Sequence, residues 1–145
     1  MGGGEPPFGL FVLPPNKKQE KIDSLFRKKK YTTISKENFE IIIEGMEQVV
    51  ESPKGTAHNI FNKDITICGK TGTAQNPHGE DHSVFIAFAP KKNPKIAIAV
   101  YIENGGWGSE WAAPISSLMI EKYLNIETNK ILENFILSGN LITKK

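Results

Sequence analysis

Four consecutive residues, Lys70-Thr71-Gly72-Thr73, combine an ammonium, two hydroxyls and a glycine. Side chains alternate along a strand, so in an extended segment Thr71 and Thr73 share one face. Gly72 carries no Cβ and leaves room for another backbone or a ligand to approach. Ammonium and hydroxyl donors suit a carboxylate, and an exposed strand can pair with an extended peptide. The segment therefore predicts a site for the terminal carboxylate of a peptide.

A second group of polar side chains is a candidate metal site. It consists of His78, Glu80, Asp81 and His82, which lie in a segment that also contains Pro77 and Gly79. Three or four of these residues could ligate zinc, but they lie on no regular face and no cysteine accompanies them. We expect a polar connecting loop and neither a metal nor another cofactor, with zinc at His78 and His82 as the alternative.

Cys68 is the single cysteine, so the chain can form no internal disulfide. The charge of nearby Lys70 would lower the pKa of this thiol and make it reactive. A buried strand cysteine is the commoner case, and it is what we expect here. Trp107 and Trp111 flank a glycine-rich corner. We expect them to plug the end of a small sheet, with substrate contact as the alternative.

Hydrophobic periodicity predicts the helix that precedes this segment. Ser35 is a candidate N-cap for a helix that runs to Val50, and Glu37 adds negative charge to its first turn. Apolar residues recur along it at spacings of three and four, which predicts a stripe packed in the core. The residues of this stripe are Phe39, Ile42, Ile43, Met46, Val49 and Val50.

Three strands and two further helices complete the predicted fold. A strand enters the Lys70 segment from Ile65, and residues 83–89 and 96–102 form a hairpin across a five-residue turn. A helix follows over residues 109–124, with Pro114 in its first turns, and a short helix spans residues 129–137. The helix over residues 109–124 should pack inward through Ala113, Ile115, Leu118, Met119 and Ile120. The fold class is α+β, with both long helices on one face of a small antiparallel sheet.

Composition limits the classes of function. The 145 residues form about one domain, with 39% hydrophobic and 23% charged residues, as in ordinary globular proteins. The net charge of +2 and the single basic run at residues 27–30 do not favour nucleic-acid binding. No stretch is long and apolar enough for a membrane span or a signal peptide.

The domain organisation follows from these segments. Residues 1–20 read as an irregular leader that contains a short strand at 8–13, and a polar helix with Ile22, Leu25 and Phe26 on one side spans 17–30. We expect the main domain over residues 21–125 and a helical tail over 126–145. A phosphate-binding loop is an alternative for Gly69-Lys70-Thr71, but that pattern needs a glycine where Asp64 stands and a helix after the lysine.

The wider sequence resembles the serine penicillin-binding proteins and the related β-lactamases, whose third signature is Lys-Thr-Gly. Several further segments occur in the order of that family, and together they resemble the class B enzymes of the elongation type (penicillin-binding protein 2). They are Gly55-Thr56-Ala57, Cys68 to Gln75, His82 to Pro90, Glu103-Asn104-Gly105-Gly106 and Ala112-Ala113-Pro114-Ile115. The resemblance covers residues 31–125 and, more loosely, the tail.

This resemblance implies a part of the penicillin-binding transpeptidase fold that crosslinks peptidoglycan in the cell wall and maintains cell shape. Lys70 would lie beside a catalytic serine, and Thr71 and Thr73 would bind the carboxylate of a D-Ala-D-Ala stem peptide or a β-lactam. The backbone N–H of Thr73 would form half of the oxyanion hole. The full-length protein would act at the periplasmic face of the inner membrane, held by an N-terminal anchor outside this chain.

One departure from the family pattern concerns the nucleophile. No serine in the chain is followed three residues later by lysine; Ser24, for example, is followed by Arg27. Ser138-Gly139-Asn140 matches the family's Ser-x-Asn box by letters, but it comes after Lys70 and not before, so we interpret it as coincidence. We therefore expect no acylation by this chain alone. The alternative is a non-catalytic structural or interaction module, and exposed apolar surface could lead the chain to self-associate.

Overall fold

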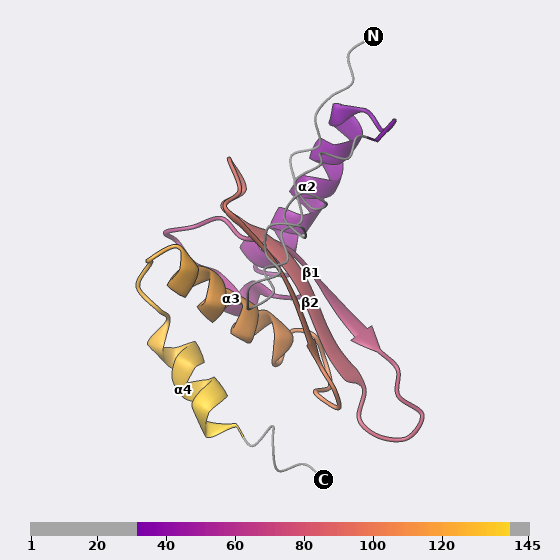
Figure 1. Cartoon of the computed structure of the whole chain (residues 1–145), viewed down its shortest axis with the longest axis vertical. Helices are drawn as coiled ribbons and strands as arrows, with labels where there is room; N and C mark the ends of the chain where they lie inside the picture. Colours follow the sequence, from indigo (N-terminus) through magenta and orange to yellow (C-terminus); the bar gives the residue numbers. More distant parts are fainter. Residues whose placement is uncertain (1–31, 140–145) are drawn as a thin grey trace, which may run out of the picture. The chain divides into compact units, whose positions relative to one another are not determined.

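The structure is a computed structural model in which residues 32–139 are described. The strand and helix predicted at 8–13 and 17–30 lie outside these residues. Contacts divide the chain into two units, residues 1–42 and 43–145, and the packing below concerns the second. Its described elements are η1 (His58–Ile60), β1 (Cys68–Ala74), β2 (His82–Ala89), β3 (Ile96–Ile102), α3 (Ala112–Tyr123) and α4 (Lys130–Ser138), and α2 (Lys36–Glu51) crosses the boundary (Figure 1). The predicted α+β class is confirmed.

The three strands form one antiparallel sheet in the order β1-β2-β3. Thr71 lies opposite Phe85 and Thr73 opposite Ser83, so these residues share one face of the sheet. On that face Phe85 is fully buried in the core. On the other face Ile86 and Tyr101 remain 48% and 56% exposed. The predicted hairpin is therefore present, and one face of the sheet carries the core.

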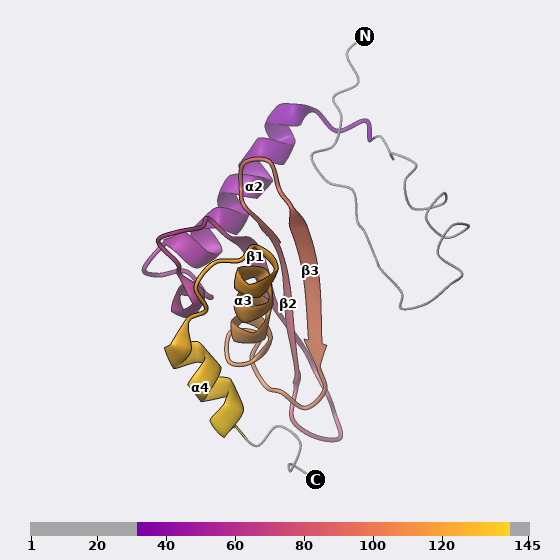
Figure 2. The same ribbon diagram turned by 60° about the vertical axis from the view of Figure 1, so that its left-hand side comes forward.

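Helix α3 covers the buried face and contacts both β2 and β3 (Figure 2). Its first turn is fixed by a sheet residue, because the Ser83 hydroxyl donates to the Trp107 carbonyl and accepts from the Ala112 N–H, at 2.8 and 3.2 Å. The inward face of α3 differs from the prediction at Met119, which is 53% exposed. The buried positions are instead mostly small or polar: Ala112, Ala113, Pro114, Ser116, Ser117, Ile120 and Glu121.

Helix α4 packs beside α3. The Asn129 side chain caps it by accepting hydrogen bonds from the Ile131 and Leu132 N–H groups. The cap residue is tied to α3, because its own N–H donates to the Glu121 carboxylate at 2.9 Å. Glu121 is only 1% exposed. The predicted short helix is thus present, and a buried carboxylate anchors its start.

Helix α2 begins at Lys36, directly after the predicted cap residue. Hydrogen bonds from its own backbone N–H and then from the Ser35 side chain lower the pKa of Glu37, as expected for a carboxylate in a first helical turn. The prediction that the whole apolar stripe packs in the core is wrong, because Val50 is the buried residue of this helix and Ile42 is 63% exposed. Only the C-terminal end of α2 therefore contributes to the core.

Candidate functional site

The predicted carboxylate-binding residues lie on β1, which is an edge strand of the sheet. Lys70 and Thr73 are exposed, and Thr71 and Gly72 are half-buried. The ammonium of Lys70 donates to the Thr71 carbonyl at 2.8 Å. Strand alternation places the Lys70 side chain on one face and both threonine hydroxyls on the other. A phosphate-binding loop is ruled out here, because the strand continues to Ala74 and no helix follows the lysine.

A third hydroxyl joins this strand from a distant segment. The Thr56 and Thr71 Oγ1 atoms are 3.0 Å apart, across fifteen residues of sequence. Thr56 lies in the connection between α2 and η1. The Gly55-Thr56-Ala57 segment had no predicted role beyond its place in the family order. The structure shows that it brings a hydroxyl to the candidate site.

Gly72 was expected to let another backbone or a ligand approach the strand. A Cβ at Gly72 would meet only Val84, at 3.4 Å, which is ordinary van der Waals contact. The close approach of another backbone is made by Gly108, whose Cβ would lie 2.3 Å from the Val84 carbonyl oxygen and 2.6 Å from the Gly72 oxygen. Packing within the described residues therefore requires a glycine at position 108. At position 72 these residues would leave room for a Cβ on the Lys70 face of the strand.

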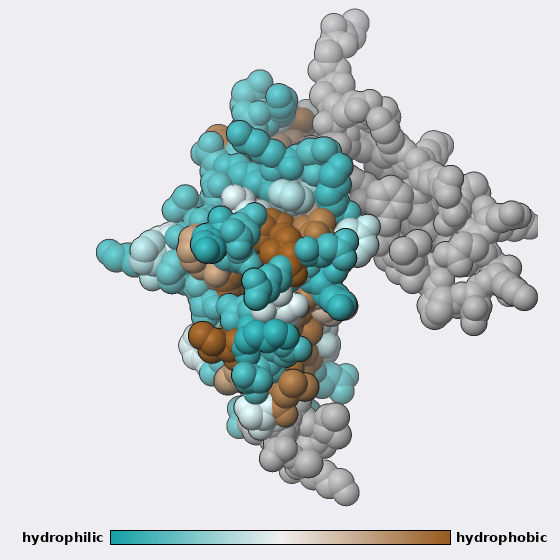
Figure 3. Space-filling view, turned by 90° about the vertical axis from the view of Figure 1, so that its left-hand side faces the viewer, coloured by the Kyte–Doolittle hydropathy of each residue, from teal (hydrophilic) through white to brown (hydrophobic). Residues whose placement is uncertain are grey.

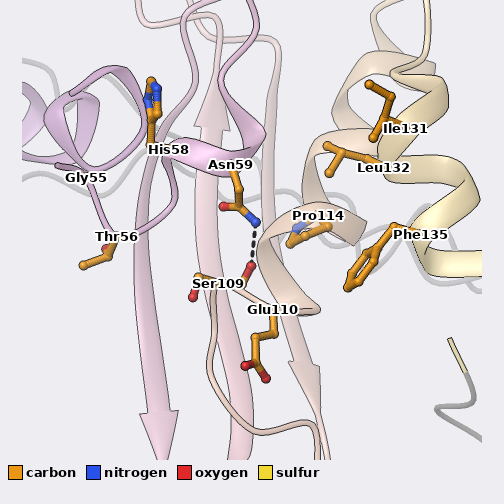
Figure 4. Close-up of a pocket in the computed structure, with 10 residues that line it drawn as sticks. All are labelled: Gly55, Thr56, His58, Asn59, Ser109, Glu110, Pro114, Ile131, Leu132 and Phe135. Carbon is orange, nitrogen blue, oxygen red and sulfur yellow. Dashed lines mark hydrogen bonds between the residues drawn. The ribbon is translucent and has the colours of Figure 1, made fainter. Parts of the chain in front are cut away.

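A groove lies next to the Thr56 segment (Figure 4). Its volume is about 560 Å³. Apolar side chains of α3 and α4 form one wall and the residues around η1 form the other, and Asn59 bridges them by donating to the Ser109 carbonyl at 2.8 Å. The lining residues are Gly55, Thr56, His58, Asn59, Ser109, Glu110, Pro114, Ile131, Leu132 and Phe135. Residues 70–73 do not line this groove, so Thr56 is its link to the candidate site.

Apolar side chains also continue along the outer surface of α4. Ile131 and Leu137 are 82% and 77% exposed. Figure 3 views the side on which α3 and α4 lie in Figure 1, and apolar patches appear there among polar residues. None of the helices within residues 32–139 is both long enough and apolar enough to cross a membrane.

The candidate metal residues form a hydrogen-bonded loop. Asp81 accepts from the Asn76 N–H at 3.0 Å, and the His82 Nδ1 accepts from the Asn104 N–H at 3.0 Å. His78 is exposed. Within the described part of the chain, no three His, Cys, Asp or Glu side chains lie close enough together to hold a metal ion. The first of these bonds lies within the β1–β2 loop, and the second ties the end of that loop to the corner after β3.

Cys68 is buried at the start of β1, as expected. Loss of solvation on burial raises the pKa of its thiol to about 11, and the negative charge of Glu47 adds to this effect. The alternative of a thiol activated by Lys70 is therefore wrong. The two charges with the largest effect on this pKa are those of Glu47 and Lys91, which form an ion pair at 2.6 Å.

The two tryptophans do not plug the sheet. Trp107 is 70% exposed. Trp111 stacks on Phe135 of α4, with ring centroids 5.0 Å apart. Gly139 also packs on Trp111, since a Cβ there would lie 2.1 Å from the indole ring. Gly139 is thus used in packing, while Asn140 of the Ser138-Gly139-Asn140 match lies outside the described residues.

Sequence reasoning missed three residues: Thr56, Ser83 and Glu121. Thr56 and Ser83 lie in segments that were noted for their family order, so position alone could have drawn attention to them. Glu121 gives a weaker signal, a single acid that follows Ile120 on the buried side of a helix.

Comparison with known proteins places these features in a family. A sequence profile described as the penicillin binding protein transpeptidase domain matches residues 18–121. Peptidoglycan D,D-transpeptidase MrdA of Haemophilus influenzae is 37% identical over 97 residues, which are 56% of this chain and 15% of that protein. The chain thus spans a small part of this relative's length.

Solved structures show the same partial likeness. The crystal structure of Pseudomonas aeruginosa PBP2 in complex with WCK 5153 matches with a TM-score of 0.63 and 34% identity, over 71% of this chain and 23% of that one. An imipenem acyl-enzyme complex of penicillin-binding protein A from M. tuberculosis matches with a TM-score of 0.56 and 33% identity, over 67% of this chain and 21% of that one.

Proposed function

Because this chain belongs to the penicillin-binding protein transpeptidase family and resembles its PBP2 (MrdA) type, we propose that residues 70–73 bind the terminal carboxylate of a D-Ala-D-Ala stem peptide or of a β-lactam. The observation that carries the proposal is that these residues lie on an exposed edge strand. An edge strand offers unpaired main-chain groups to an extended peptide. Hydroxyls and an ammonium in the same stretch add charge-assisted donors for its carboxylate.

The chemistry divides among the four residues. Thr71 and Thr73 offer hydroxyls from one face of the strand, and Lys70 supplies positive charge from the opposite face. The Lys70 ammonium bonds to the Thr71 carbonyl, which supports a strand whose odd-numbered backbone groups point to the open edge. The N–H of Thr73 would then point the same way and serve as half of an oxyanion hole, and one such donor contributes about two to three orders of magnitude in rate.

The reaction is acyl transfer: a serine hydroxyl attacks the D-Ala-D-Ala peptide bond, forms an ester and releases the terminal D-Ala. An amine of a neighbouring stem peptide then attacks the ester, forms the new amide and releases the serine. Residues of this chain bind and polarise the substrate, whereas the serine nucleophile and its activating lysine are not among them. We place the full-length protein at the periplasmic face of the membrane, where it crosslinks peptidoglycan. A non-catalytic interaction module is the second candidate, and the exposed apolar residues of α4 favour it.

Binding of a short peptide tests the proposal on this chain. Acetyl-Lys-D-Ala-D-Ala is titrated into ¹⁵N-labelled protein beside the same peptide with a C-terminal amide. The acid should shift the amide signals of residues 70–73 and bind more tightly than the amide. Lys70→Met should weaken binding of the acid peptide. The matched control Lys92→Met, at an exposed turn lysine, should not. Equal binding of acid and amide would refute carboxylate recognition, and the module would then be the better description.

A further inference from the structure

The contact between Thr56 and Thr71 joins two hydroxyls at the surface of the candidate site. Their Oγ1 atoms are 3.0 Å apart, and either atom can be the donor. Thr56 is exposed and Thr71 is half-buried. An exposed hydrogen bond between neutral groups adds little to folding stability, because water competes for both partners. The pairing therefore needs another explanation than stability.

The backbone around Thr56 is held firmly on both sides. The Gly55 N–H donates to the Ser52 carbonyl at 2.8 Å, and the Ala57 N–H donates to the Val49 carbonyl at 2.9 Å. A Cβ at Gly55 would lie 2.3 Å from the Val49 oxygen. Ala57 is fully buried in the core. These contacts fix the place of the Thr56 hydroxyl beside β1 and so preorganise it.

We propose that Thr56 is a positioning residue that orients the hydroxyl proton of Thr71 toward a bound carboxylate, and this proposal rests on the proposed function. Each threonine hydroxyl has one proton to donate and can also accept. When Thr71 donates to Thr56, its proton is not available to a ligand. When Thr56 donates to Thr71, the Thr71 proton is free for the carboxylate. An anion at Thr71 selects the second arrangement, and the two bonds in series strengthen each other.

The position of Thr56 also indicates how it acts on Thr71. Thr56 belongs to the connection between α2 and η1, and its Oγ1 meets that of Thr71 while the residue also lines the edge of the groove. It therefore supports Thr71 from a segment outside the sheet. Its contribution should depend on the charge of the ligand and not on the shape of the peptide.

The test uses three variants and the two peptides described above. Thr56→Val keeps the shape and removes the hydroxyl, whereas Thr56→Ser keeps the hydroxyl. Thr56→Val should weaken binding of the acid peptide by about threefold to tenfold, the effect of one hydrogen bond. It should leave binding of the amide peptide unchanged. Thr56→Ser should restore the affinity for the acid. The matched control Thr128→Val, in the loop before α4, should bind both peptides as the parent does.

A double-mutant cycle with Thr71→Val shows whether the effect passes through Thr71. With Thr71 already changed, Thr56→Val should cause no further loss. An equal loss for acid and amide, or an undiminished loss in the Thr71→Val background, would overturn the positioning role. If the parent chain distinguishes acid from amide and Thr56→Val binds as tightly as the parent, this inference fails while the proposed function stands. If the parent chain makes no distinction, the proposed function fails first.

Discussion

Replacement of Glu121 should reveal how a buried carboxylate holds three segments together. The Glu121 Oε1 accepts from the Asn62 Nδ2 at 3.0 Å and from the Ser117 hydroxyl at 3.2 Å, and its Oε2 accepts from the Asn129 N–H at 2.9 Å. The residue is 1% exposed. Removal of the side chain leaves these donors without their acceptor and opens a cavity.

The loss of folding free energy in Glu121→Ala follows from what each of the three donors can do without the carboxylate. The Ser117 hydroxyl can turn to a backbone carbonyl, as Ser116 does with the Ala112 carbonyl. Half-buried Asn62 can reach water. The Asn129 N–H belongs to the backbone and cannot turn, so it stays unsatisfied. Such a group costs about 1–3 kcal/mol, and with the lost packing we expect Glu121→Ala to lower the free energy of unfolding by about 3 kcal/mol.

Glu121→Gln is the informative comparison. The glutamine oxygen can still accept from the Asn129 N–H, while its amide group faces Asn62 and Ser117, which can reorient. We therefore expect a loss of about 1 kcal/mol, close to that of one hydrogen bond. The matched control Glu127→Gln replaces an exposed acid in the loop before α4 and should change stability by less than about 0.5 kcal/mol.

Urea unfolding followed by tryptophan fluorescence measures these differences, since Trp111 stacks on Phe135 of α4. Hydrogen exchange at the Ile131 and Leu132 amides reports the α4 start, and it should speed up more in Glu121→Ala than in Glu121→Gln. A Glu121→Ala variant as stable as the parent would refute the reasoning. A Glu121→Gln variant as unstable as Glu121→Ala would show that the charge of the group, and not its acceptor atoms, is what matters.

Three further predictions follow from the site and its support. Gly108→Ala should lower the free energy of unfolding by more than about 2 kcal/mol through overpacking, because its Cβ would lie 2.3 Å from the Val84 oxygen; Gly72→Ala, the matched control, should cost less than about 1 kcal/mol in the same urea assay. The Cys68 thiol has a pKa of about 11 in the folded protein and 9.0 as an ordinary thiol. Between pH 9 and 11 the thiol therefore loses its proton in the unfolded state but keeps it in the folded state. Stability should fall across that window more in the parent than in Cys68→Ala, and an equal fall would contradict the raised pKa. Incubation with a fluorescent penicillin should leave no covalent label after denaturing electrophoresis, and a stable adduct would show that another residue can act as the nucleophile.

The sequence predicted the sheet well because its signals are local. The apolar runs at 83–89 and 96–102 are separated by a short polar turn, and β2 and β3 form within one residue of these bounds. The buried face of helix α3 was harder to predict. Periodicity selected Met119 as buried, whereas Ser116 and Glu121 lie inside. Their polar atoms are satisfied by partners that no hydropathy pattern encodes.

The sequence predicted the strand that carries residues 70–73 but not the contacts that support it, and the binding role of these residues stays a prediction. Lys70 to Thr73 form an edge strand as expected. The contact between Thr56 and Thr71 depends on how the chain folds back after α2, and the spacing of fifteen residues gives no sign of it. Likewise, the glycine that packing requires is Gly108, not Gly72. Long-range approach of backbones cannot be read from a short motif.

The support for β1 explains how an edge strand can keep a fixed position. Gly69 lets the ring of Phe85 pack against the strand, since a Cβ there would lie 2.3 Å from the ring. Gly108 closes on the backbone at Gly72, and Thr56 meets Thr71 from the loop. All of these contacts approach from the preceding loop, from the buried face or through the paired side of the strand. Within the described residues, none of these contacts uses the unpaired edge of β1, which is the edge where the proposed peptide would pair.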